Sequence, residues 1–215
     1  MHTEAILLIG AGGHCKVVLD ALRLARRGLS VEIRDDKSVH AVCDLLGCRI
    51  QTPIGGPDSW PDEVHVAIGD NAIRKKYGLD ALDARRHFCS VVHPGAVISA
   101  ESTLARGVFL AACCVVGPCA EIDDGAIVNH GALIDHDCRV GAWAHIAPRA
   151  VLGGAVSIGE GCLIGSGAVI QPGRKIGEWA IVGSGAVVTR DVPPKATVVG
   201  IPARLLYTGT KERET

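Results

Sequence analysis

Aliphatic residues recur every six positions, without a break, from Val92 to Val188. An α-helix returns to one face every 3.6 residues and a β-strand every two, so a strict period of six fits neither element in simple form. The period does fit a short strand followed by a turn, and three such units close one triangular coil of about 18 residues. The sequence therefore predicts a solenoid over this half of the chain. The aliphatic positions are Val92, Ile98, Leu104, Leu110, Val116, Ile122, Val128, Ile134, Val140, Ile146, Leu152, Ile158, Ile164, Ile170, Ile176, Val182 and Val188.

The residue four positions after each aliphatic residue is usually small, and Arg174 is the one large polar exception. We expect the aliphatic side chain to point into the prism and the small one to let the next corner pack. Glycine often follows the aliphatic residue directly, where we expect a corner that tolerates no bulky side chain and that can require a positive φ. These glycines are Gly117, Gly141, Gly153, Gly159, Gly165, Gly177 and Gly183.

The chain before the repeats has a different pattern, typical of a small parallel α/β sheet with a βαβ start. Residues 1–88 are therefore predicted to form one domain and residues 89–215 the solenoid with a C-terminal extension. Ligands of such sheets bind at the carboxyl ends of the strands, and each predicted strand here ends in glycine or polar residues. The predicted elements are strands at Glu4–Ile9, Val31–Arg34 and Val64–Ile68, a helix over roughly His14–Arg27 with Val17, Val18, Ala21, Leu22 and Ala25 on its apolar side, and a second helix, capped by Gly69-Asp70-Asn71, ending near Ala84.

Charge and composition exclude several classes of partner. The formal net charge is −1, so no basic excess attracts the chain to nucleic acid or to an anionic membrane. No stretch reaches the roughly 18 apolar residues that span a bilayer, and the N-terminal run lacks the basic flank of a signal peptide. The nine cysteines include no CxxC pair and several occupy small repeat positions, which favours reduced thiols in a cytoplasmic protein.

A glycine-rich turn, Gly10-Ala11-Gly12-Gly13-His14, links the first strand to the first helix. A dinucleotide fingerprint would place a third glycine where Cys15 stands, so the match is incomplete. Gly12, Gly13 and the helix N-terminus still offer backbone N–H groups to a phosphate. Asp35 or Asp36, after the second strand, would accept from a ribose hydroxyl or a base edge. The alternative is a tight turn without any ligand.

Several motifs occur in one order: GAGGHCKVV, DD after the second strand, GDNAIRKK after the third, HPGAVIS at the first repeat, VNHGALIDHDCRVGAWAHIAP, and a closing VVGIPARLL. Together they resemble the hexapeptide-repeat sugar-nucleotide acetyltransferases of the sialic-acid O-acetyltransferase type, over nearly the whole chain. That resemblance implies a left-handed parallel β-helix, a homotrimer, and acetyl transfer from acetyl-CoA to the 4-amino group of a UDP- or GDP-linked 4-amino-4,6-dideoxy sugar.

The resemblance also implies roles for individual residues. His136 corresponds to the general base and Asp137 to the acid that raises its basicity. Acetyl-CoA would be held by His145 beside the thioester, by the Gly154 N–H near its carbonyl, and by Ser166 and Ser184 along the pantetheine arm. His130 stands where the family more often has a small hydroxyl residue. The nucleotide sugar would be held by Gly12, Gly13, His14, Asp35, Asp36 and Gly69.

Reasoning from the residues supports a histidine base and leaves the acceptor open. Acetyl transfer to an amine needs a base and a donor for the developing oxyanion, and histidine is mostly neutral in the cytosol. His136 is the second residue after inward-pointing Ile134, so we expect it to project outward. A histidine base serves hydroxyl acceptors equally, so an O-acetyltransferase of sialic acid or a related sugar stays an alternative. The sequence does not distinguish UDP from GDP or name the sugar.

A metal-dependent or non-catalytic solenoid is the remaining alternative. The γ-class carbonic anhydrases bind zinc on the same kind of solenoid and include an H-x4-H pair. Here His130 and His136 are separated by five residues, and His136 and His145 by eight. Because this spacing departs from that family and the N-terminal sheet has no role in it, we expect no metal.

Overall fold

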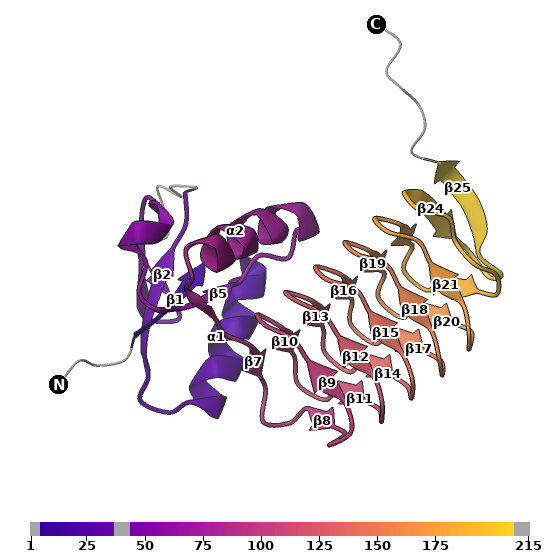
Figure 1. Ribbon diagram of the computed structural model, residues 1–215, viewed down its shortest axis with the longest axis horizontal. Coiled ribbons are helices and arrows are strands. Elements are labelled where there is room, and N and C mark those ends of the chain that lie inside the picture. The colour runs from indigo at the N-terminus through magenta and orange to yellow at the C-terminus, as the bar shows by residue number, and fades with distance from the viewer. Residues whose placement is uncertain (1–4, 37–43, 209–215) are drawn as a thin grey trace, which may run out of the picture.

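The computed structural model describes residues 5–36 and 44–208, which form an α/β layer followed by a long triangular prism (Figure 1). The α/β layer contains one six-stranded sheet in the order β3-β4-β2-β1-β5-β6, in which all pairs are parallel except the β3–β4 hairpin. Its elements are β1 (Ala5–Ile9), α1 (Gly13–Ala25), β2 (Ser30–Arg34), β3 (Asp44–Leu45), β4 (Cys48–Gln51), the 3-10 helix η1 (Pro57–Ser59), β5 (Glu63–Val66), α2 (Asn71–Asp83) and β6 (His87–Phe88).

The central strand β1 is buried on both faces, as its unbroken apolar sequence predicts. Ile6 and Leu8 pack with the buried side of α1, whereas Leu7 and Ile9 pack on the opposite face with Trp60 and other apolar side chains. The helix α2 begins where expected, because the Asp70 side chain caps it by accepting from the Ile73 N–H at 2.9 Å.

Two details of this half differ from the sequence prediction. Helix α1 ends at Ala25, which is exposed, while Cys15 and Leu19 join its buried face. The β3–β4 hairpin and η1 were not predicted, because two- to four-residue elements carry no readable periodicity. Glu4, the predicted start of the first strand, lies outside the described residues.

The repeats form the predicted left-handed β-helix, whose two-residue strands stack into three parallel sheets. The first prism sheet contains β7 (Val91–Val92), β10 (Phe109–Leu110), β13 (Ile127–Val128), β16 (His145–Ile146), β19 (Leu163–Ile164), β22 (Ile181–Val182), β24 (Ala196–Val199) and the antiparallel β25 (Arg204–Thr208). The second contains β8 (Val97–Ile98), β11 (Val115–Val116), β14 (Leu133–Ile134), β17 (Val151–Leu152), β20 (Val169–Ile170) and β23 (Val187–Val188). The third contains β9 (Thr103–Leu104), β12 (Glu121–Ile122), β15 (Arg139–Val140), β18 (Ser157–Ile158) and β21 (Lys175–Ile176).

The six-residue pattern fills the prism as predicted. From Val108 onward, the aliphatic positions and the small positions form one continuous buried core, and Val92, Ala96, Ile98 and Leu104 pack against it. Arg174 leaves this core by turning out towards Asp191, 3.8 Å away. The expectation of a positive φ at the glycines after the aliphatic residues is wrong. A side chain there is excluded by contact instead: a Cβ on Gly159 would lie 2.5 Å from the backbone nitrogen of Glu178 in the next coil. The positive φ falls two residues later, at Gly161 and equivalent positions.

Backbone hydrogen bonds stack equivalent turns of successive coils into three corners. The serine corner, between the first and second sheets, contains His130, Pro148, Ser166 and Ser184. The histidine corner, between the second and third sheets, contains Pro118, His136, Gly154 and Pro172. The tryptophan corner, between the third and first sheets, contains Asp124, Trp143, Glu160 and Trp179.

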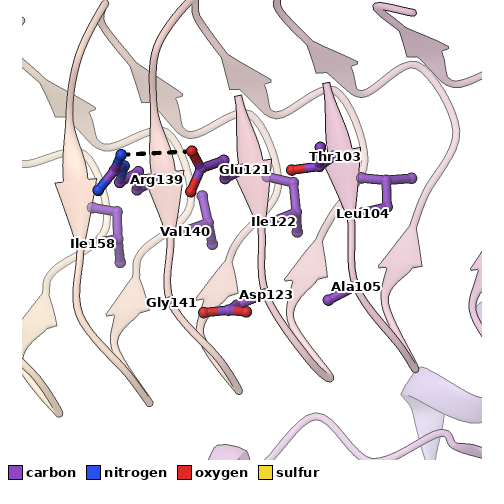
Figure 2. A pocket seen from close by; sticks show the side chains of 10 residues that line it. All are labelled: Thr103, Leu104, Ala105, Glu121, Ile122, Asp123, Arg139, Val140, Gly141 and Ile158. Carbon is purple, nitrogen blue, oxygen red and sulfur yellow. Dashed lines mark ion pairs between the residues drawn. The ribbon is translucent and has the colours of Figure 1, made fainter. Parts of the chain in front are cut away.

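The outer faces of the sheets differ in polarity. The third sheet is polar outside: Figure 2 shows Glu121 and Arg139 pointing toward one another, and their charged groups are 3.6 Å apart. The second sheet is apolar outside, and part of this apolar face is open to solvent: Val97 is 63% exposed and Val169 is 37% exposed. The full outward row of the second sheet is Val97, Val115, Leu133, Val151, Val169 and Val187.

The α/β layer covers the beginning of the first prism sheet and the tryptophan corner. Phe109 and Ile127, on the outer face of that sheet, share a buried cluster with β1 and α1. Phe88 stacks on Trp143, with ring centroids 5.9 Å apart. The strand ends of the α/β sheet are therefore held against the prism. No helix within the described ranges is long and apolar enough to cross a membrane.

Candidate active site

The carboxyl ends of the α/β strands surround a cavity of about 490 Å³. All six residues assigned to the nucleotide sugar from the sequence line it: Gly12, Gly13, His14, Asp35, Asp36 and Gly69. Sequence reasoning missed Ile54, Ile73 and Tyr77, which line the same cavity together with Gly10, Ala67 and Ile68. Their types carry no chemical signature, but Ile73 and Tyr77 stand one helical turn apart in α2, after the recognised GDN motif.

The two aspartates shape this cavity through bonds within the chain. Asp35 Oδ2 accepts from the Ala11 N–H at 2.7 Å and so holds the glycine turn. Asp36 accepts from the Ile54 N–H and from the Tyr77 hydroxyl, both at 2.8 Å, and these bonds lower the pKa of its carboxyl. Each carboxylate therefore has a structural task besides any contact with a ligand.

The glycine turn leaves the N-terminus of α1 open. Gly12 is its N-cap and contributes no side-chain cap, and a Cβ built on Gly12 or Gly13 would meet no atom within 4 Å. The first N–H groups of the helix thus face the cavity without steric cover. This is an arrangement that favours a phosphate.

Where the cavity meets the prism, two imidazoles are held uncharged. Burial, and then the neighbouring His145, lower the pKa of His14 to about 3. Its Nε2 has no hydrogen-bond partner among the described residues. Burial, and then the charge of Arg74, lower the pKa of His145 to about 4. The two ring centroids are 6.2 Å apart, and His145 Nε2 lies 3.1 Å from Asn129 Nδ2.

His136 projects outward from the histidine corner, as its position after Ile134 predicts. Its Nδ1 lies 2.7 Å from Asp137 Oδ2, and its backbone N–H donates to Asp135 Oδ1 at 2.8 Å. The hydrogen bond to Asp137, followed by the charge of Asp135, raises the pKa of His136. With Nδ1–H directed at Asp137, Nε2 carries the free lone pair.

Gly154 lies next to that lone pair, one coil further along the histidine corner. A Cβ built on Gly154 would come within 2.5 Å of His136 Nε2, so only glycine leaves the imidazole where it stands. The Gly154 N–H has no hydrogen-bond partner among the described residues. A base and a free backbone donor therefore stand side by side.

The four residues assigned to acetyl-CoA do not form one cluster in a single chain. Ser166 and Ser184 stack on the serine corner, where the Gly185 N–H donates to the Ser166 carbonyl at 2.9 Å, and His130 belongs to the same ladder. Gly154 is on the histidine corner, and His145 is on the first prism sheet. The prism has a triangular section, so the histidine corner is opposite the sheet that the α/β layer covers. His136 and the cavity of one chain thus face different directions.

Metal-ligating side chains do not gather at this site. The described part of the chain contains no group of three or more His, Cys, Asp or Glu side chains arranged to hold a metal ion.

Three family models match successive or overlapping parts of the chain. Residues 5–78 match the PglD N-terminal domain, residues 83–172 match the GMPPB C-terminal domain, and residues 155–190 match the bacterial transferase hexapeptide (six repeats). A comparison with curated protein sequences gives no significant match.

Solved structures resemble the chain over nearly its whole length. PerB from Caulobacter crescentus, in complex with CoA and GDP-perosamine, is 38% identical, with a TM-score of 0.86 over 94% of this chain and 96% of its own. The acetyltransferase domain of PglB from Neisseria gonorrhoeae, in complex with acetyl coenzyme A, is 32% identical, with a TM-score of 0.85 over 95% and 100%. WeeI from Acinetobacter baumannii is 29% identical, with a TM-score of 0.83 over 94% and 99%.

Proposed function

Because the chain belongs to the hexapeptide-repeat sugar-nucleotide N-acetyltransferases, we propose that it acetylates the 4-amino group of a nucleotide-linked 4-amino-4,6-dideoxy sugar, using acetyl-CoA. The observation that carries this proposal is the His136–Asp137 pair, with its free Nε2 beside the Gly154 N–H. GDP is the first nucleotide to test, since the 38% identical PerB was solved with GDP-perosamine. UDP is the second.

The chemistry follows from that geometry. The sugar amine attacks the thioester carbonyl while His136 Nε2 takes its proton, and Asp137 stabilises the resulting imidazolium. The Gly154 N–H donates to the oxygen on which negative charge develops. When the tetrahedral intermediate collapses, the N–C bond is complete, the C–S bond breaks, and the imidazolium returns a proton to the CoA thiolate. The base is then regenerated.

The two substrates occupy separate parts of the proposed site. The cavity of residues 1–88 holds the nucleotide sugar, with its phosphates at the N-terminus of α1 and its sugar directed toward His14. The prism coils within the predicted domain of residues 89–215 hold acetyl-CoA, with Ser166 and Ser184 along the pantetheine arm. His145, beside His14, stands where the acetyl group must meet the acceptor.

The working unit in this proposal is a homotrimer. The cavity and His136 of one chain face different directions, so an acceptor bound to one chain reaches the base of a neighbour. The apolar outer row of the second prism sheet supports this arrangement, because such a row is expected where chains pack together. In the proposed trimer, this row packs on the uncovered part of a neighbour's first sheet. The contact is head-to-tail and closes as a ring of three chains.

A cytoplasmic location is part of the same proposal. All eight cysteines in the described ranges are free thiols, and acetyl-CoA and sugar nucleotides are cytoplasmic substrates.

Steady-state kinetics test the reaction. With acetyl-CoA, we expect release of CoA thiol on addition of a GDP- or UDP-linked 4-amino-4,6-dideoxy sugar, but not of sialic acid. His136→Asn should lower kcat by about 10²–10⁴-fold and leave acetyl-CoA binding within about twofold of wild type. Turnover of sialic acid alone, or near-normal turnover by His136→Asn, would contradict the proposal.

A further inference from the structure

Arg74, on α2, is the one charged side chain that the described part of the chain buries apart from a histidine, with an exposure of 1%. A guanidinium removed from water is costly unless its donors are all satisfied and its charge is compensated. No carboxylate within the described ranges forms an ion pair with it. Backbone carbonyls and Asn71 Oδ1 satisfy its donors instead, so the guanidinium joins the segments that carry these acceptors.

The donors of Arg74 connect two parts of the proposed site. Nη1 donates to the carbonyls of Ile68 and Gly69, at 3.0 and 3.1 Å, and these residues form one wall of the nucleotide-sugar cavity. Nε donates to the Gly125 carbonyl at 2.8 Å, and Nη2 to the Trp143 carbonyl at 2.6 Å. One planar group thus spans the cavity wall and the turn that leads into β16.

Asn71 extends this connection to the next coil. Its Oδ1 accepts from Arg74 Nη2 at 2.8 Å, while its Nδ2 donates to the carbonyls of Gly161 and Cys162 at 3.0 and 3.1 Å. Both residues belong to the GDNAIRKK segment, for which sequence reasoning found no role beyond capping α2.

We propose that Arg74 is a positioning residue for acetyl transfer: its guanidinium fixes the cavity wall at Gly69 against the strand that carries His145, so that the bound sugar meets a neutral imidazole in one orientation. This inference rests on the proposed function. Burial is the first cause of the lowered pKa of His145 and the charge of Arg74 the second. Arg74 thus holds the turn that leads to this imidazole and helps to keep the imidazole uncharged.

The test compares Arg74→Met, Arg74→Lys and Asn71→Ala with Arg139→Met, which removes an exposed arginine from the third prism sheet. Arg74→Met should raise KM for the sugar nucleotide about tenfold or more and leave KM for acetyl-CoA within about twofold. Arg74→Lys should be impaired similarly, because one ammonium does not span both groups of carbonyls. Asn71→Ala should also raise KM for the sugar nucleotide and spare KM for acetyl-CoA, but the rise should be smaller than in Arg74→Met. Arg139→Met should behave as wild type.

A second readout separates positioning from general stability. Titration of the His145 ring by nitrogen-15 NMR should show a higher pKa in Arg74→Met than in wild type, whereas Arg139→Met should not change it. If Arg74→Met does not fold, Arg74→Lys and Asn71→Ala carry the KM comparison. Wild-type KM values in the folded variants would overturn the inference, as would an unchanged His145 titration in folded Arg74→Met. A wild-type enzyme that acetylates no sugar nucleotide would instead overturn the proposed function, and the His145 titration would still be measurable.

Discussion

At the scale of single residues, the proposed chemistry depends on how three side chains are charged. His136 is exposed and its carboxylate neighbours raise its pKa, whereas burial holds His14 and His145 neutral, with pKa values of about 3 and 4. Only His136 therefore changes its charge near neutral pH among these three. The acid limb of the pH–rate profile should report this one imidazole.

Asp137→Asn should move that limb. A base works only when uncharged, so kcat falls as the pH drops through the pKa of His136. Removing the Asp137 carboxylate removes the first cause of the raised pKa, so the acid limb should shift to lower pH while the plateau of kcat falls about tenfold. Asp135→Asn, which removes the second cause and leaves the Nδ1 hydrogen bond, is the matched control and should shift the limb less. An unmoved acid limb in Asp137→Asn would contradict the assigned pair.

Gly154→Ala tests the contact between the base and its neighbour. The new methyl group would overlap His136 Nε2, and since the imidazole is at the end of a flexible side chain, it can rotate away at little cost in stability. We expect kcat to fall at least about tenfold, with the midpoint of urea unfolding close to that of wild type. Wild-type kcat would show that this corner does not hold the reacting groups.

At the scale of elements, the sequence predicted the coil repeat well and its corners less well. The aliphatic and small positions could be read because each coil repeats the same packing, and the outward direction of His136 followed from the same register. The positive φ was misplaced because glycine is used in this chain for two reasons: close approach of coils at Gly159, and a left-handed turn at Gly161. A single sequence does not separate the two.

Two substitutions distinguish these reasons. Gly159→Ala forces backbone apart between adjacent coils and should lower the free energy of unfolding by about 1–3 kcal/mol or more. Gly173→Asn introduces a larger side chain at a left-handed corner, where a Cβ meets nothing within 4 Å, and asparagine tolerates that conformation. It should cost less than Gly159→Ala in urea unfolding. The reverse order would contradict this explanation of the corners.

At the scale of the whole molecule, the sequence predicted both halves of the proposed site but not their relation. The six residues assigned to the nucleotide sugar line one cavity, yet Tyr77 and the buried Arg74 were missed, because their roles arise from contacts between elements distant in the chain. Nor does the register of the repeats reveal that the α/β layer covers the sheet opposite the histidine corner. That relation exists only in the folded chain, and it leads to the shared site.

Mixing two inactive variants tests the shared site most directly. A His136→Ala chain has an intact cavity, and a Gly12→Trp chain, whose new side chain fills the open space at the glycine turn, has an intact base. In a ring of three, every mixed trimer contains one cavity facing an intact His136, so an equal, random mixture should recover about one quarter of wild-type activity. Light scattering should give about three times the 22.4 kDa chain mass for each sample. If the mixture stays as inactive as its components although mixed trimers form, the cavity and His136 do not meet across chains, and the account is contradicted.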